Sequence, residues 1–181
     1  MSSLRALLRA ARHTPDRLLH GLRRASLSGR LARRPPKTIG MICYCNICRS
    51  PYAAATAARA LAKLGLNEPR VWSAGLVGPG RPSPDTAIVA ARESGIDLTG
   101  HRSRLLAHHG VDVGDWIFVI APWQARAVRE QFPGTRIALL GDLDPQPIDS
   151  RAIPDPMDRS LETFRSCYER IDRCVGAMAA A

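Results

Sequence analysis

The chain lacks any long hydrophobic run, although 45% of its 181 residues are apolar. A helix that crosses a membrane needs about 20 consecutive apolar residues, so the sequence predicts no membrane span. The length suits one domain with its own hydrophobic core. We therefore expect a cytoplasmic protein and leave peripheral attachment to a membrane open.

Acidic residues are scarce at the N-terminal end of the chain. Residues 1–37 contain nine arginines and one lysine but a single acid, Asp16, which gives this segment a net charge of +9. Residues 38–181 contain sixteen basic and fifteen acidic residues. The basic character thus belongs to an extension over residues 1–37, and residues 38–181 form a nearly neutral domain. The charge of that domain gives no reason to expect nucleic-acid binding.

The extension has the pattern of short amphipathic helices. Leu4, Leu7 and Leu8 share one helical face, and Thr14-Pro15 is a typical start for a second helix. This pattern predicts an amphipathic or disordered arm over residues 1–36 that binds an anionic membrane surface or an acidic partner. An organelle-targeting segment and a solvated basic tail remain as alternatives.

Cysteines are few and crowded, because three of the five, Cys43, Cys45 and Cys48, fall within six positions. A secreted disulfide framework spreads its cysteines over distant segments, so this crowding indicates reduced thiols that do chemistry or bind metal. A zinc site lacks an obvious second pair of ligands, since Cys167 and Cys174 lie on a predicted core helix. We expect no metal there.

From residue 38 onward, strand and helix patterns alternate. This order predicts an α/β fold with a small parallel sheet of about four strands and helices on both faces. The predicted strands cover residues 38–42, 71–74, 116–120 and 136–140, and the predicted helices cover residues 50–64, 84–94, 122–132 and 161–178.

The first predicted strand runs directly into Cys43, and a helix begins about seven residues later. A loop between a strand and a helix N-terminus gathers unpaired N–H groups and the positive end of the helix dipole, which together bind phosphate. Arg49 adds a planar fork for two phosphate oxygens. The same surroundings favour the thiolate of Cys43, the nucleophilic form of cysteine. Spacing alone is weak evidence, because Cys167 and Arg173 repeat it inside a predicted helix.

The segment Cys43–Pro51 resembles the signature of the low-molecular-weight protein tyrosine phosphatase family, Cys-x-Gly-Asn-Ile-Cys-Arg-Ser-Pro. The likeness continues in Trp72-Ser73-Ala74-Gly75, in Gly95-Ile96-Asp97-Leu98, in His101-Arg102-Ser103-Arg104 and in Asp155-Pro156. It covers residues 38–178 and leaves the basic extension uncovered.

The resemblance implies a phosphatase that acts through a phospho-cysteine intermediate and needs no metal or organic cofactor. Cys43 matches the nucleophile, Arg49 the phosphate-binding arginine and Asp155 the general acid. Cys48 matches a thiol that can form a disulfide with the nucleophile. The expected substrate is a phosphorylated protein or a small aryl phosphate. The remaining predicted site residues are Tyr44, Cys45, Asn46, Ile47 and Ser50 in the phosphate-binding loop, and Ser73 as its support.

The sequence departs from the family pattern at positions that shape the site. Cys45 replaces a usual glycine, which predicts strain if that position requires a positive φ. Met157 stands where eukaryotic members carry an aromatic residue, and residues 76–82 contain no aromatic. Tyr44 and Trp123 are the candidates to compensate. These departures concern the walls of the substrate cleft and leave the residues of the chemistry unchanged.

Two other functions compete with the phosphatase. Arsenate reduction uses a related fold but needs a relay of further cysteines, and residues 49–166 contain none. A non-catalytic anion-binding or scaffold protein has no need for the set of Cys43, Arg49 and Asp155.

Overall fold

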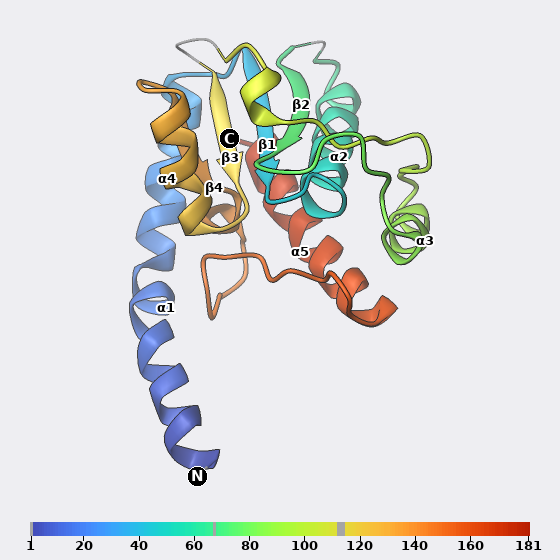
Figure 1. Cartoon of the computed structure of the whole chain (residues 1–181). Coiled ribbons are helices and arrows are strands. Elements are labelled where there is room, and N and C mark those ends of the chain that lie inside the picture. Colours follow the sequence, from blue (N-terminus) through green and yellow to red (C-terminus); the bar gives the residue numbers. More distant parts are fainter. Residues whose placement is uncertain (1, 67, 112–114) are drawn as a thin grey trace.

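The computed structural model describes residues 2–66, 68–111 and 115–181, with side chains from residue 14 onward. Its centre is a parallel four-stranded sheet with the strand order β2-β1-β3-β4 (Figure 1). The strands are β1 (Thr38–Cys43), β2 (Arg70–Gly75), β3 (Trp116–Val119) and β4 (Arg136–Leu139). The predicted α/β fold with a small parallel sheet is therefore confirmed.

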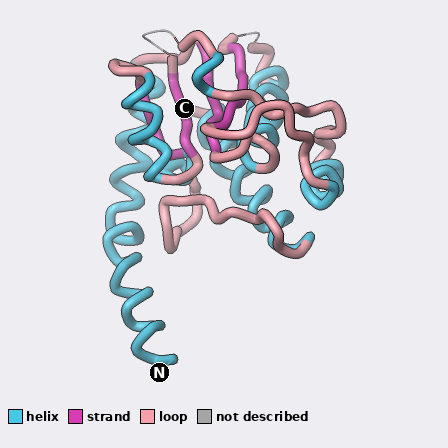
Figure 2. Tube along the Cα trace, viewed as in Figure 1, coloured by secondary structure: helices cyan, strands magenta, loops and turns pink. Residues whose placement is uncertain are grey.

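Helices cover both faces of this sheet (Figure 2). The larger hydrophobic cluster joins β1 residues such as Ile39 and Met41 to α2 (Arg49–Lys63), α3 (Asp85–Glu93) and α5 (Leu161–Ala179). The smaller cluster joins Ile42 and the facing residues of β3 and β4 to α4 (Pro122–Gln131). Neighbouring residues of β1 thus point to opposite faces, as the alternation of side chains along a strand requires.

Two short 3₁₀ helices were not predicted from the sequence. They are η1 (Leu106–His108) and η2 (Leu140–Leu143). Each spans only three or four residues, a length too short to show a helical period in the sequence. η2 matters for the site, because the irregular segment after it carries Asp155.

The N-terminal extension forms α1 (Ser2–Arg33), one continuous helix rather than two short ones. Pro15 lies inside it, which removes one helical hydrogen bond. Leu27 and Leu31 are buried in the larger hydrophobic cluster, so hydrophobic packing on the domain holds the C-terminal part of the helix. Figure 1 shows the N-terminal part of α1 extending beyond the rest of the molecule. The functional division at residue 37 stays a prediction.

Among the described helices, none combines the length and the apolar character that crossing a membrane requires.

Candidate active site

The first strand brings Cys43 to the carboxyl edge of the sheet. β1 ends at Cys43 and α2 begins at Arg49, so residues 44–48 form a loop between them, called the phosphate loop below. Pro51 lies in the first turn of α2, where the missing backbone N–H costs no helical hydrogen bond. The unpaired N–H groups of that turn follow the loop directly, an arrangement that favours anions.

The sulfur of Cys43 lies among hydrogen-bond donors. The backbone N–H of Asn46 donates to Cys43 Sγ at 3.2 Å, and Ser50 Oγ lies 3.0 Å from the same sulfur. A thiolate carries no proton, so Ser50 donates to it in that state. Cys43 is only 3% exposed. These contacts stabilise negative charge on a sulfur that is otherwise shielded from water.

Asn46 holds the phosphate loop in shape. Its φ of 53° lies in the left-handed region, where asparagine is tolerated better than most residues. Its side-chain Nδ2 donates to Ser50 Oγ and to Ser73 Oγ, both at 2.9 Å. Its Oδ1 accepts from the backbone N–H of Arg104 at 2.9 Å. One buried side chain therefore ties the loop to α2, to β2 and to the segment that follows α3.

Two backbone details explain how the loop tolerates Cys45. The described non-glycine residues with positive φ are Asn46 and Asp158, so Cys45 needs no left-handed conformation and the expected strain does not arise. Gly75, at the end of β2, is the position that requires glycine. A Cβ there would lie 2.8 Å from the carbonyl oxygen of Tyr44 and 2.9 Å from Asn46 N. The loop packs directly on that glycine.

Arg49 and Asp155 meet beside the sulfur, although they lie 106 positions apart. The Arg49 side chain is 7% exposed and makes an ion pair with the half-exposed carboxylate of Asp155. Arg49 also donates to the carbonyl oxygen of Ile153 at 3.1 Å. Asp155 accepts from the backbone N–H of Met157 at 3.2 Å. The guanidinium is thus fixed at one end of the site and the carboxylate at its open side.

The predicted site residues lie around one small pocket. Its lining comprises Cys43, Cys45, Ile47, Cys48, Arg49, Asp155 and Met157. Asn46 and Ser50 contact the Cys43 sulfur, and Ser73 of β2 accepts a hydrogen bond from Asn46. No three His, Cys, Asp or Glu side chains in the described part of the chain are grouped to hold a metal ion. An oxyanion in the pocket would lie beside the Cys43 sulfur, the Arg49 guanidinium and the Asp155 carboxyl group.

The comparisons with known proteins agree with this geometry. Residues 38–181 match the family described as low molecular weight phosphotyrosine protein phosphatase. The chain belongs to this family. Among curated relatives, Wzb of Escherichia coli strain K12 is 33% identical over 144 residues, which cover 78% of this chain and 92% of that protein. EpsP of Ralstonia solanacearum, named a probable low molecular weight protein-tyrosine-phosphatase, is 31% identical over 144 residues, which again cover 78% of this chain and 92% of that protein.

Solved structures of the family share the fold. Wzb from Escherichia coli K30 in complex with sulphate has a TM-score of 0.66 at 27% identity, over 80% of this chain and 96% of that one. A YwlE arginine phosphatase from Geobacillus stearothermophilus has a TM-score of 0.68 at 25% identity, over 80% and 92%. The predicted family and the predicted phosphatase activity are confirmed, and the protein is a cysteine-dependent phosphatase.

This family member has more thiols at its site than one nucleophile requires. All five cysteines are free. Burial and the neighbouring Cys43 and Asp155 raise the pKa of Cys48 far above its usual range. Burial also raises the pKa of Cys167 to about 12. Both groups are therefore protonated at neutral pH and are poor nucleophiles there.

Two exposed aromatic residues, Tyr44 and Trp123, lie close to each other near the phosphate loop. Tyr44 and Trp123 make an edge-to-face contact with 5.5 Å between ring centroids. Both remain exposed, Tyr44 by 44% and Trp123 by 54%. Tyr44 follows β1 and Trp123 follows β3, which is the neighbouring strand. The pair therefore lies at the same edge of the sheet as Cys43.

The sequence motifs did not reveal every residue that shapes this phosphatase site. His101, which the sequence analysis named only as part of a family-like segment, donates from Nε2 to the carbonyl oxygen of Asn46 at 2.6 Å. Burial lowers the pKa of His101, which keeps the ring neutral at pH 7 and leaves one N–H for this bond. Tyr168 of α5 donates to the carbonyl oxygen of Cys48 at 3.4 Å. Only the family-like segment around His101 gave a signal for either role.

Proposed function

We propose that this phosphatase hydrolyses phosphotyrosine in proteins, with Cys43 as nucleophile, Arg49 as phosphate-binding residue and Asp155 as general acid. One observation supports these roles above all. The sulfur that accepts the Asn46 N–H lines the same pocket as the Arg49 guanidinium and the Asp155 carboxyl group. A nucleophile, an oxyanion-binding group and a proton donor thus converge on one point.

The first chemical step transfers the phosphoryl group to sulfur. The Cys43 thiolate attacks phosphorus, an S–P bond forms, and the bond from phosphorus to the tyrosine oxygen breaks. Protonated Asp155 gives its proton to that oxygen, which leaves as a neutral phenol. Arg49 binds two equatorial oxygens as charge develops on them. Substrate must first take Arg49 away from Asp155, because these two side chains pair with each other in the free protein.

The second step releases phosphate and restores the enzyme. Asp155, now a carboxylate, removes a proton from a water molecule that attacks phosphorus. The S–P bond breaks, inorganic phosphate leaves, and Cys43 returns to the thiolate. Ser50 and the Asn46 N–H stabilise the departing thiolate at 3.0 and 3.2 Å. The same carboxyl group therefore serves both steps in opposite protonation states.

The substrate proposal rests on the aromatic pair. Exposed Tyr44 and Trp123 offer ring faces and edges to a phosphorylated aromatic side chain and its flanking residues. The competing substrate is phosphoarginine, since one structural relative is described as an arginine phosphatase. A guanidinium leaving group calls for acidic side chains at the mouth of the pocket. Asp155 is the one acid among the residues that line it.

The test compares phosphotyrosine and phosphoarginine peptides of the same sequence, with p-nitrophenyl phosphate as the reference substrate, across pH about 4–8. We expect turnover of the phosphotyrosine peptide, its loss in Cys43→Ser and a strong reduction in Asp155→Asn. Asp158→Asn, three positions away, is the matched control and should keep full activity. Preferred turnover of the phosphoarginine peptide would refute the substrate assignment, and unchanged turnover in Cys43→Ser would refute the nucleophile.

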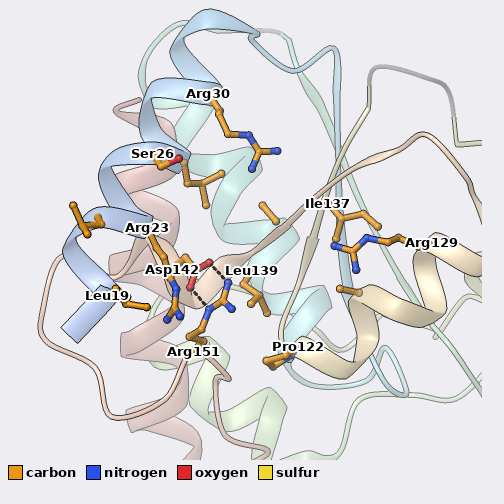
Figure 3. Close-up of a pocket in the computed structure, with 14 residues that line it drawn as sticks. Leu19, Arg23, Ser26, Arg30, Pro122, Arg129, Ile137, Leu139, Asp142 and Arg151 are labelled. Carbon is orange, nitrogen blue, oxygen red and sulfur yellow. Dashed lines mark hydrogen bonds and ion pairs between the residues drawn. The ribbon is translucent and has the colours of Figure 1, made fainter. Parts of the chain in front are cut away.

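A second proposal concerns the predicted anionic partner of residues 1–36. A groove of about 580 Å³ lies between α1, α4 and β4 (Figure 3). Leu19, Leu22 and Ile137 give it an apolar wall, and Arg30 and Arg129 extend into it from opposite sides. Neither arginine has an ion-pair partner among the described residues. Beside the groove, Leu18 is 75% and Leu22 71% exposed. Exposed leucines beside arginines without an acidic partner suit an anionic lipid surface.

Vesicle co-sedimentation tests this partner. We expect the full chain to bind vesicles that contain phosphatidylserine and not vesicles of phosphatidylcholine alone, with weaker binding at higher salt. Arg30→Gln combined with Arg129→Gln should weaken binding, and Leu18→Ser combined with Leu22→Ser should also weaken it. Binding to polyglutamate without binding to any vesicle would point to an acidic protein instead and would overturn the membrane proposal.

A further inference from the structure

Asp155 lies on a long irregular segment rather than on a helix or strand. Residues 144–160 connect η2 to α5 without regular secondary structure (Figure 1), and residues 144–157 of this connection are called the acid loop below. A general acid must be held within a fraction of an ångström of its working position. A segment of this length holds a side chain in place only where other parts of the protein anchor it.

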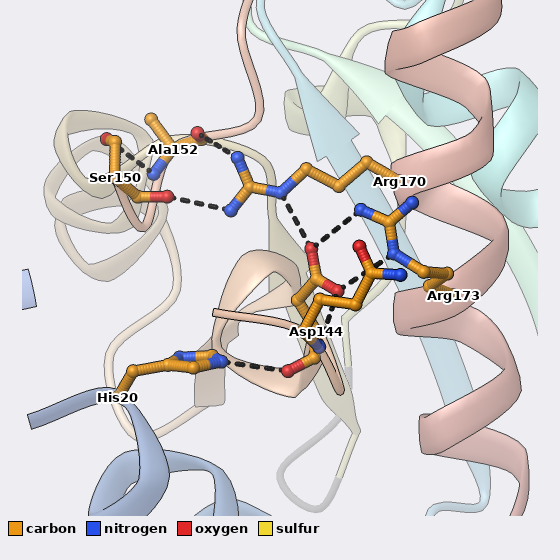
Figure 4. A network of polar contacts seen from close by, with 7 residues as sticks. His20, Asp144, Ser150, Ala152, Arg170 and Arg173 are labelled. Carbon is orange, nitrogen blue, oxygen red and sulfur yellow. Dashed lines mark hydrogen bonds and ion pairs between the residues drawn. The ribbon is translucent and has the colours of Figure 1, made fainter. Parts of the chain in front are cut away.

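One set of anchors comes from α5 and centres on Asp144 (Figure 4). The Asp144 carboxylate, 2% exposed, pairs with Arg170 at 3.1 Å and with Arg173 at 3.0 Å. Arg170 also donates to the carbonyl oxygens of Ser150 at 2.7 Å and Ala152 at 3.1 Å. A single guanidinium thus joins the beginning of the acid loop to its middle.

A second set of anchors comes from α1 and reaches the other side of the same loop. His20 Nε2 donates to the carbonyl oxygen of Asp144 at 2.8 Å, and this histidine is 6% exposed (Figure 4). The Asp16 carboxylate accepts from the backbone N–H of Arg151 at 3.2 Å. Arg24 donates to the carbonyl oxygen of Pro145 at 2.9 Å. These contacts bind both ends of the stretch from Asp144 to Arg151.

The α1 contacts differ in what they contribute. The pair of Arg17 with Asp149, 2.8 Å between Nε and Oδ1, is exposed on both sides and stabilises little. Asp16 is held by a further pair with Arg23 at 3.0 Å, with both side chains about one quarter exposed. Loss of His20 would leave a buried carbonyl oxygen without its donor, which is costly. Among the contacts from α1, those of His20 and Asp16 therefore constrain the loop most.

We propose that α1 positions the acid loop, and through it Asp155, for proton transfer. His20 and Asp16 act as positioning residues because they fix the loop backbone four to eleven residues before Asp155 without touching the pocket. α1 lies outside residues 38–181, the part that matches the family, so this chain adds these anchors to the family's domain. The inference rests on the proposed role of Asp155 as general acid.

The leaving group of the substrate separates positioning from mere stability. Phenol, like tyrosine with its pKa of about 10, leaves readily only when it is protonated, whereas 2,4-dinitrophenolate leaves without a proton. A displaced Asp155 therefore lowers kcat/KM for phenyl phosphate and spares 2,4-dinitrophenyl phosphate. A general loss of folded protein lowers both values by the same factor.

The experiment measures kcat/KM for both substrates in the full chain. We expect His20→Leu to lower the phenyl phosphate value by about 5- to 20-fold and the dinitrophenyl value by less than about 2-fold, as small displacements of catalytic groups do. His20→Gln, whose amide nitrogen can replace Nε2, should restore most of the loss. Asp16→Ala should act in the same direction more weakly. If His20→Leu does not fold, Asp16→Ala and Arg24→Ala carry the test.

Asp155→Asn is measured alongside and distinguishes the two ways of failing. If Asp155→Asn lowers kcat/KM for both substrates by the same factor, the general-acid role itself is wrong and the positioning role is wrong with it. If Asp155→Asn lowers kcat/KM for phenyl phosphate selectively, but the α1 variants lower kcat/KM for both substrates equally or for neither, only the positioning role is overturned. Arg126→Ala on α4, which makes an exposed pair with Glu130, is the control expected to match wild type.

Discussion

Replacing Asn46 with alanine should damage the protein more than any single hydrogen bond would suggest. The change removes three side-chain hydrogen bonds, to Ser50, to Ser73 and from the Arg104 N–H. At about 1 kcal/mol each these contribute about 3 kcal/mol. Alanine at a φ of 53° adds about 1 kcal/mol of backbone strain. We expect the free energy of unfolding to fall by about 4 kcal/mol.

Ser73→Ala is the matched comparison for that variant. It removes one of the same hydrogen bonds and leaves the backbone of the phosphate loop untouched. Its expected cost is about 1 kcal/mol, and its kcat/KM should fall only a few-fold. Asn46→Ala should lose far more activity, because the Asn46 N–H that contacts the Cys43 sulfur moves when the loop relaxes.

Urea denaturation and p-nitrophenyl phosphate kinetics on the three proteins provide the measurement. The additive contribution of the three hydrogen bonds would be contradicted if the free energy of unfolding of Asn46→Ala fell by only about 1 kcal/mol, as in Ser73→Ala. It would mean that the loop keeps its shape through the backbone alone. Full activity in a destabilised Asn46→Ala would separately show that the N–H position over the sulfur does not depend on this side chain.

Three further perturbations test other parts of the structure. Gly75→Ala should cost about 1–3 kcal/mol and most of the activity, because its Cβ would meet the phosphate-loop backbone at 2.8–2.9 Å; a fully active variant would contradict this packing. The buried thiols of Cys167 and Cys174, each with a pKa raised to about 12, favour the folded state while protonated. The stability they contribute is complete below pH 9.0, the thiol pKa in the unfolded chain, and is lost as pH rises toward 12. The urea midpoint of the wild type should therefore decline above pH 9.0, and that of Cys174→Ala should decline less steeply. Trp123→Ala should raise KM for a phosphotyrosine peptide several-fold and change KM for p-nitrophenyl phosphate little. The substitution removes the edge-to-face contact with Tyr44, which contributes about 1 kcal/mol to the order of this aromatic surface. Equal effects on both substrates would place the pair outside the peptide-binding surface.

The sheet and the phosphate loop could be predicted because their signals are local. The first strand is a short apolar run, and Pro51 marks the first turn of the next helix. Gly65 and Gly95, both with a φ of 72°, follow the ends of α2 and α3 as expected for helix-terminating glycines. Each of these features depends on neighbours within a few positions, so the sequence alone was sufficient to place them.

The connections around the site depend on distant parts of the chain and left little trace in the sequence. Asp155 and Arg49 approach each other across 106 positions, and only the family resemblance singled out Asp155. The hydrogen bond of His101 to Asn46 is a side-chain-to-backbone contact, for which periodicity carries no signal. The pairing of Tyr44 with Trp123 follows from the adjacency of β1 and β3, a property of strand order rather than of either residue.

The docking of α1 shows why a charge pattern was insufficient to predict its position. Arginine excess suggests a solvated or membrane-bound arm, yet the charges here divide between two surfaces. Arg17 and Arg24 face the acid loop, while Arg30 covers the ring of Trp116 and lines the open groove. The helix can therefore contact an anionic surface along the groove without releasing the loop that carries Asp155. The ratio of kcat/KM for phenyl phosphate to kcat/KM for 2,4-dinitrophenyl phosphate can be measured with and without bound vesicles. If vesicle binding leaves this ratio unchanged, the two surfaces act independently. If vesicle binding changes it, α1 couples the membrane to proton transfer.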